Sequence, residues 1–174
     1  MRVSRSRDPA AQGGMMLIES MVSILLLAVG ILGLLAMAAR ATATLSDSEY
    51  RTLASERASE MMQSIWIGVN RTDAASIQTS LQSFVHQPDQ SGACNFSGTA
   101  SSVAEVSAWT SKVMNGAINP GGVADPATRL PGSTSAMQQI AYSPADNNRI
   151  TITLCWQGPH DGVPRRQVLS SYIN

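Results

Sequence analysis

Charged residues are scarce in this sequence. They make up 14% of the 174 residues, whereas about 25% is usual for a soluble domain. The 12 basic and 12 acidic side chains balance, so the formal net charge is zero. A protein that binds the phosphates of nucleic acid needs a basic face, and an equal number of basic and acidic side chains does not favour such a face. We therefore expect no nucleic-acid partner.

Residues that build catalytic and metal sites are also few. Cys94 and Cys155 are the only cysteines, and His86 and His160 are the only histidines. No pair among them has the spacing of a metal site. The sequence contains no phosphate-binding loop and no GxSxG elbow. We expect a protein that is not an enzyme, with no cofactor, no metal ion and no small-molecule substrate.

Aromatic residues are rare, at 5% of the chain against 44% hydrophobic residues in total. Much of the aliphatic content lies in Gly13–Ala39, where Glu19 is the only charged residue. The uncharged run Ser20–Ala39 would form a helix about 30 Å long, which matches the hydrocarbon core of a bilayer. The arm 1–14 before it is basic. The positive-inside rule therefore keeps the N-terminus in the cytoplasm and places the rest across the membrane.

Three interpretations of this N-terminal region compete. A secretory signal peptide is one, because Ala36-Met37-Ala38 and Ala41-Thr42-Ala43 resemble cleavage sites, although the apolar run is longer than usual. A plain single-pass anchor is the second. It explains the length of the run but not Glu19 or the glycines before it. The third interpretation uses all of these features.

The segment Gly14-Met15-Met16-Leu17-Ile18-Glu19, followed by a long apolar helix, resembles the processing motif of the type IV pilin-like family. The resemblance implies that a prepilin peptidase cuts the Gly14–Met15 bond and methylates the new amine of Met15. In the family the acid lies five residues beyond the cut, which selects Gly14 over Gly13. The motif departs from the common pattern by having Met15 for Phe, Met16 for Thr, and no basic residue directly before the glycines.

Glu19 is the residue for which the resemblance implies an assembly role. A carboxylate deep in a membrane helix costs about 2.5–3.5 kcal/mol, and less near the interface. In the first turn of the mature helix the macrodipole favours an anion. In the pilin-like family this acid meets the N-terminal amine of a neighbouring subunit, which neutralises both charges and favours entry into the filament. The alternative is an acid at the bilayer edge that lipid headgroups solvate.

Within the family, the stretch Ala28–Leu35 resembles the span of minor pilins, and it lacks the proline that often kinks major pilins. This implies a low-abundance subunit that binds other minor pilins and the major pilin. It would prime pilus assembly from the inner membrane, with its globular part in the periplasm, and end at or near the pilus tip. The alternatives are a pseudopilin of a type II secretion system and, in a different class, a secreted binding domain whose signal peptide is removed.

The helix that starts at Met15 is expected to continue to about Trp66. After Arg40 its apolar residues recur at spacings of three and four, and charged residues that include Arg57 fill the other face. The apolar stripe consists of Tyr50, Leu53, Ala54, Ala58, Met61, Met62, Ile65 and Trp66. The predicted organisation is a leader peptide (1–14), a transmembrane or filament-core helix (15–39), an amphipathic helix (40–66) and a globular α+β region (67–174).

The globular region contains signals for two short helices, near 73–85 and 103–115. Strand signals come late, at 137–142, 149–156 and 167–173, and the middle strand alternates apolar residues with Thr and Cys. These strands predict an antiparallel meander of three, or of four if another strand lies in the loops. Its apolar face would pack on the stripe of the long helix. The expected fold is α+β, with a long N-terminal helix packed on a small antiparallel sheet.

Cys94 and Cys155 are expected to pair if the globular region is exported, because an oxidising compartment favours disulfides. They lie 61 positions apart. Closing a loop of that length stabilises the folded state by roughly 4 kcal/mol on the chain-entropy model. The alternative is a pair of buried free thiols.

Overall fold

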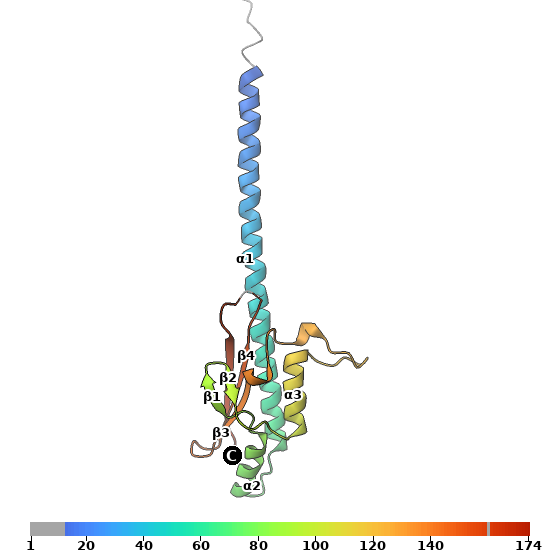
Figure 1. Ribbon diagram of the computed structural model, residues 1–174, viewed down its shortest axis with the longest axis vertical. Coiled ribbons are helices and arrows are strands. Elements are labelled where there is room, and N and C mark those ends of the chain that lie inside the picture. Colours follow the sequence, from blue (N-terminus) through green and yellow to red (C-terminus); the bar gives the residue numbers. More distant parts are fainter. Residues whose placement is uncertain (1–12, 160) are drawn as a thin grey trace, which may run out of the picture. The chain divides into compact units, whose positions relative to one another are not determined.

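The computed structural model describes residues 13–159 and 161–174, apart from the side chains of residues 13–15, 43 and 91. A long helix comes first, and short helices and strands follow it (Figure 1). The elements are α1 Gly13–Gly68, α2 Ala74–Phe84, β1 Asp89–Gly92, β2 Asn95–Ser97, α3 Ala104–Asn115, the 3-10 turns η2 Pro126–Thr128 and η3 Ser135–Met137, β3 Gln138–Ser143, β4 Arg149–Trp156 and β5 Arg165–Tyr172.

The chain divides into two compact units, Met1–Ser46 and Asp47–Asn174. We call the second the head unit. It contains the last part of α1, from Asp47 to Gly68, together with every later element. The last turns of α1 are therefore a structural part of the head unit.

In the N-terminal unit, every described side chain of α1 from Met16 to Thr42 is exposed. The segment is rich in Leu, Met and Ala, which are strong helix formers, and it contains no proline. By length and composition, α1 is able to cross a membrane. The helix already begins at Gly13, two residues before the start expected from the sequence. Residues 1–12 of the predicted leader lie outside the described residues.

The main sheet is antiparallel with the strand order β3-β4-β5. Ile152 in β4 lies opposite Ile140 in β3 and Leu169 in β5. The predicted three-strand meander is confirmed, and β4 has the bounds that the sequence predicts. Its alternation of Ile and Leu with Thr is the strongest strand pattern in the chain, because it matches a pleated surface with one face on a core.

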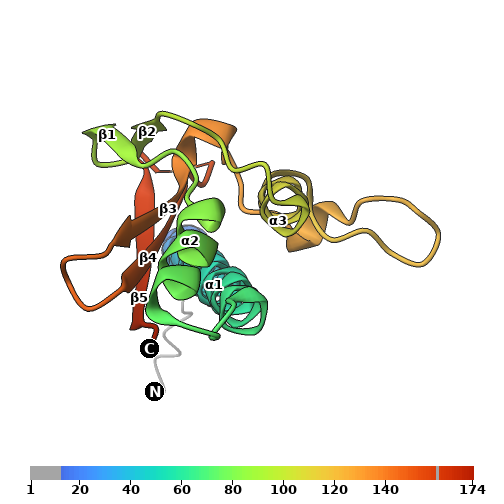
Figure 2. The ribbon, with the colours of Figure 1, turned by 90° about the horizontal axis from the view of Figure 1, so that it is seen from below.

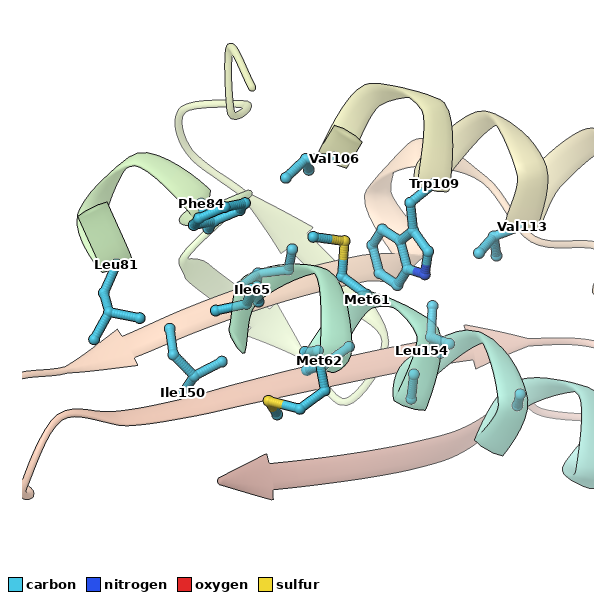
Figure 3. Close-up of a cluster of buried hydrophobic side chains, with 14 of the residues drawn as sticks. Met61, Met62, Ile65, Leu81, Phe84, Val106, Trp109, Val113, Ile150 and Leu154 are labelled. Atoms are coloured by element: carbon cyan, nitrogen blue, oxygen red, sulfur yellow. The ribbon is translucent and has the colours of Figure 1, made fainter. Parts of the chain in front are cut away.

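The hydrophobic core lies where α1 crosses one face of this sheet. Ala54, Ala58 and Ile65 of α1 are fully buried, as are Ile152 and Leu154 of β4. Figure 3 shows side chains from α1, α2, α3 and β4 gathering in this cluster. Helix α2 adds Leu81 and Phe84, and α3 adds Val106, Trp109 and Val113. The coarse prediction of an α+β fold with a long helix packed on a small antiparallel sheet is confirmed.

The other face of β4 is covered in part by a hairpin that the sequence did not predict. Strands β1 and β2 pair antiparallel in a separate sheet. Phe96 of β2 packs with Met137 and Cys155 in a second, smaller cluster. The predicted disulfide joins Cys94 in the hairpin turn to Cys155 in β4, with an S–S distance of 2.01 Å. The disulfide therefore fastens the hairpin to the outer face of the main sheet.

Two expectations for the surface of α1 are wrong. Arg57, predicted to face solvent, is only 4% exposed, because α3 and the segment around Thr128 pack over it. Trp66, predicted to be buried, is 41% exposed and has the Arg71 guanidinium 5.3 Å from its ring centre. In both cases later parts of the chain, and not the helical period alone, decide which side of α1 is covered.

Candidate functional site

The predicted processing and assembly residues lie in the first turns of α1. Gly14 and Met15 are within the helix, but their side chains lie outside the described part of the chain, and the cut between them remains a prediction. Glu19 follows Met15 by four residues, so the two positions share one helix face about 6 Å apart along the axis. Helical side chains lean toward the N-terminus, so Glu19 leans toward position 15.

Glu19 is exposed and has strongly apolar neighbours. Met16 and Val22, three residues to either side, are 74% and 49% exposed. The nearest hydroxyl groups are used locally, because Ser20 Oγ donates to the Met16 carbonyl and Ser23 Oγ donates to the Glu19 carbonyl, each at 2.8 Å. Within the described residues, no cation pairs with the Glu19 carboxylate.

The contact between α1 and α3 contains a partly buried polar cluster, in which Arg57 is buried and Glu60 and Lys112 are partly exposed. Arg57 Nη1 donates to Glu60 Oε2 at 3.0 Å, and Lys112 of α3 donates to the other oxygen of the same carboxylate. Trp109 Nε1 donates to the Arg57 carbonyl at 2.8 Å. Burial alone would raise the pKa of Glu60, but the bonds from Lys112 and Arg57 outweigh it and hold that pKa below its ordinary value. The carboxylate therefore stays ionised and locks α3 onto α1.

A second charged cluster ties the start of β5 to α1. Arg165 Nη1 lies 3.0 Å from Asp47 Oδ1, and its Nη2 lies 2.8 Å from Asp161 Oδ1. The hydrogen bond from Arg165 lowers the pKa of Asp161. Because Asp47 begins the head unit, this cluster fixes the sheet to the first turn of α1 that belongs to the head unit.

The histidines form no site in the described part of the chain. His86 is buried, its Nδ1 accepts the Ser101 N–H at 3.2 Å, and burial lowers its pKa. His160 lies outside the described residues. Among the residues that the structure describes, no group of three or more His, Cys, Asp and Glu could hold a metal ion. His86 has a structural place between α2 and β1, since its backbone bridges to Ile140.

The loop between α3 and η2 extends away from the rest of the head unit (Figure 2). It is a tight ribbon, in which Asn119 N–H donates to the Val123 carbonyl and Gly122 N–H donates to the Asn119 carbonyl. Gly122 has a φ of 75°, which a β-branched residue would adopt only with strain. Ile118 and Val123 are 74% and 66% exposed on this ribbon. The sequence predicts a turn here but not an ordered apolar surface.

Sequence patterns predict the disulfide correctly but miss the residues that join the head unit together. Arg57 and the Asp47–Arg165 pair gain their roles from elements far away in the chain. Among these contacts, the sequence offered a clue only to the hydrogen bond of Trp109, because a buried indole N–H usually finds an acceptor. Comparison of the chain with protein-family models, with curated proteins and with solved structures finds no match.

Proposed function

We propose that this chain is the precursor of a minor pilin of the type IV pilus. The observation that carries the proposal is the position of Glu19. This single acid lies five residues beyond Gly14, at the start of an exposed apolar helix that continues into the core of an α+β head unit. Neither a signal peptide nor a plain membrane anchor explains why the acid, the glycines and the continuous helix occur together.

The processing step would expose the charge that assembly needs. Hydrolysis of the Gly14–Met15 bond leaves a carboxylate on the leader and a free amine on Met15, which the prepilin peptidase then methylates. The mature chain starts with a cation one helical turn from the Glu19 anion. Either charge alone is costly in a bilayer, at about 2.5–3.5 kcal/mol for a charge at the centre. Pairing the amine of one subunit with Glu19 of the next offsets this cost and fixes their register.

The head unit would supply the second part of assembly, which is docking beside other subunits. The α1 segment from Asp47 to Gly68 is held to α3 by the Arg57 cluster and to β5 by the Asp47–Arg165 pair. These contacts hold the sheet and α3 to the part of α1 that belongs to the head unit. Partners would be other minor pilins and the major pilin. The resemblance of Ala28–Leu35 is to the subgroup of type IV pilus modification protein PilV, which favours a priming role and a place at or near the tip.

Localisation follows from the same proposal. Before assembly the chain would be anchored in the inner membrane by α1, with a cytoplasmic N-terminus and a periplasmic head unit. The Cys94–Cys155 disulfide supports an oxidising compartment for the head unit. After assembly the chain would be part of the pilus on the cell surface.

A deletion strain that carries a tagged copy of the full chain tests this function. We expect the deletion to reduce surface pili severely, and the tagged chain to restore them and to appear in small amounts in sheared pili. Protein secretion should be unchanged. Normal pili combined with a loss of secreted proteins would instead identify a type II pseudopilin. Normal piliation and secretion, with the tagged chain free in the medium, would support the secreted binding domain.

A further inference from the structure

A single histidine lies where three elements of the head unit meet. His86 follows the end of α2, and its main chain pairs with Ile140 of β3 through two hydrogen bonds of 3.0 Å, one in each direction. Its ring nitrogen Nδ1 accepts the Ser101 N–H at 3.2 Å. Ser101 lies shortly before α3. His86 therefore connects the end of α2, the strand β3 and the segment that leads into α3.

Ser101 extends this connection to both helices. Its Oγ donates to the Ser83 carbonyl, in the last turn of α2, at 2.6 Å. The same Oγ accepts the N–H of Val103, the N-cap residue of α3, at 3.2 Å. Helix ends leave backbone groups without partners inside the helix, and these two bonds satisfy one such group on each helix. We call Ser83, His86, Ser101, Val103 and Ile140 the His86 junction.

The His86 junction requires a neutral imidazole ring. Because Nδ1 accepts a hydrogen bond, the single ring proton is on Nε2. Nε2 is buried and has no hydrogen-bond partner among the described residues. A second proton would turn Nδ1 into a donor that faces the Ser101 N–H, so the bond between them would be lost. It would also place a charge on a side chain that is only 6% exposed, which is costly.

No nearby charge in the described part of the chain would stabilise a protonated His86. Helix α2, strand β2 and the segment 98–103 contain no titratable side chain. The titratable side chains of the other surrounding elements are Asp89 of β1, Tyr142 of β3, Glu105 and Lys112 of α3, and Arg57 and Glu60 of the α1 stretch 57–68. Both Lys112 and Arg57 bond to Glu60. None of these groups shifts the pKa of His86, which burial alone lowers below its ordinary value of 6.5.

The backbone beside His86 is strained in the closed junction. Gln87 has a φ of 47°, in the left-handed region that residues other than glycine adopt at a cost. Its N–H donates to the Thr99 carbonyl at 3.0 Å, so this conformation is held by the same segment that contains Ser101. Release of that segment would relieve the strain. The strain therefore favours opening once the bond between His86 and Ser101 is lost.

We propose that protonation of His86 opens the His86 junction, so that the segment 99–103 separates from the end of α2 in mildly acidic surroundings. The Cys94–Cys155 disulfide keeps the β1–β2 hairpin on β4. The opening is therefore confined to the connection between β2 and α3. The inference rests on the head unit alone and holds whether or not the chain is a pilin.

The direction of the pH effect follows from the two states of His86. In the open junction the ring is solvated and its pKa returns to the ordinary value of 6.5, whereas in the closed junction the pKa is lower. The open state therefore binds the proton more tightly, and acid favours it. The closed junction has its full stability above the ordinary pKa and loses stability as the pH falls through 6.5.

Hydrogen exchange of the full chain in detergent tests this switch. Protection factors, which correct for the effect of pH on exchange itself, are compared at about pH 7.5 and about pH 5.5. The amides of Ser101 and Val103 should lose protection severalfold at the lower pH, up to the limit of about tenfold that one proton per opening sets. The amide of Ile152 in β4 should keep its protection. Equal protection of Ser101 at both pH values, or an equal loss at Ile152, would overturn the proposal.

The variant His86→Asn separates titration from shape. The side-chain oxygen of Asn accepts a hydrogen bond in place of Nδ1 and does not titrate, so protection of Ser101 should be the same at both pH values. His160→Asn is the matched control, because His160 is the only other histidine, and it should keep the full pH effect. A pH effect that persists in His86→Asn, or disappears in His160→Asn, would refute the proposal. If His86→Asn does not fold, the native chain at the two pH values decides alone.

Discussion

Replacing Glu19 with alanine should leave the precursor cleavable but reduce its amount in pili by about tenfold or more. The carboxylate is exposed and has no cation partner within the described residues, so its removal leaves the fold of the head unit unchanged. What is lost is the pairing with the amine of a neighbouring subunit. A pairing worth about 1.4 kcal/mol, which is below the 2.5–3.5 kcal/mol cost of a charge at the bilayer centre, changes an equilibrium by about tenfold. Immunoblots of sheared pili and of membranes measure this ratio.

Two matched variants separate charge from shape. Glu19→Gln keeps the size of the side chain and its ability to accept a hydrogen bond, and it should fail as Glu19→Ala does. Glu49→Gln removes an exposed acid from the head-unit part of α1 and should assemble normally. Normal entry of the Glu19→Gln chain into pili would show that the charge has no part in assembly.

Removal of the disulfide should have the largest effect on the stability of the head unit. Closing the loop between Cys94 and Cys155 is worth roughly 4 kcal/mol on the chain-entropy model. The double variant Cys94→Ala, Cys155→Ala should therefore lower the unfolding temperature of the head unit by about 10–20 °C. The loss begins at the β1–β2 hairpin, because Phe96 and Met137 make a small cluster around this bond. Near-ultraviolet circular dichroism of the full chain in detergent measures the transition.

Reduction provides the control for this variant. Dithiothreitol should lower the unfolding temperature of the native chain to that of the double variant, and it should have no effect on the double variant itself. If the double variant unfolds at the native temperature, the hairpin is held by its other contacts and the disulfide is not a stabilising element.

Local sequence patterns predicted the bounds of those elements whose hydrophobic periodicity matches the faces that are buried in the folded structure. Strand β4 has its predicted bounds because Ile150, Ile152 and Leu154 alternate with threonines over one core face. The helices α2 and α3 lie within one residue of their predicted ranges. Strand β5 begins two residues earlier than predicted. Pairing with Trp156, and not strand propensity, makes Arg165 part of it.

The missed features depend on contacts between distant parts of the chain. The β1–β2 hairpin is composed of Asp, Gln, Gly, Asn and Ser around Phe96, which is a loop composition by any local measure. Its strands exist because the disulfide and Phe96 hold them on β4. Arg57 is a polar residue on a helix and was assigned to solvent. Its ion-pair partner Glu60 lies three residues further along α1, but the burial of Arg57 comes from α3 and the segment around Thr128. No local pattern carries this information.

The N-terminal residue of the mature chain decides whether a prepilin peptidase processes this protein. Membrane-bound protein should be analysed by terminal sequencing and mass spectrometry, in cells with and without the prepilin peptidase. We expect normal cells to yield a chain starting at N-methylated Met15 and cells lacking the peptidase to retain the leader. A chain starting at Ala39 or Thr44, or one trimmed identically in both kinds of cell, would contradict it.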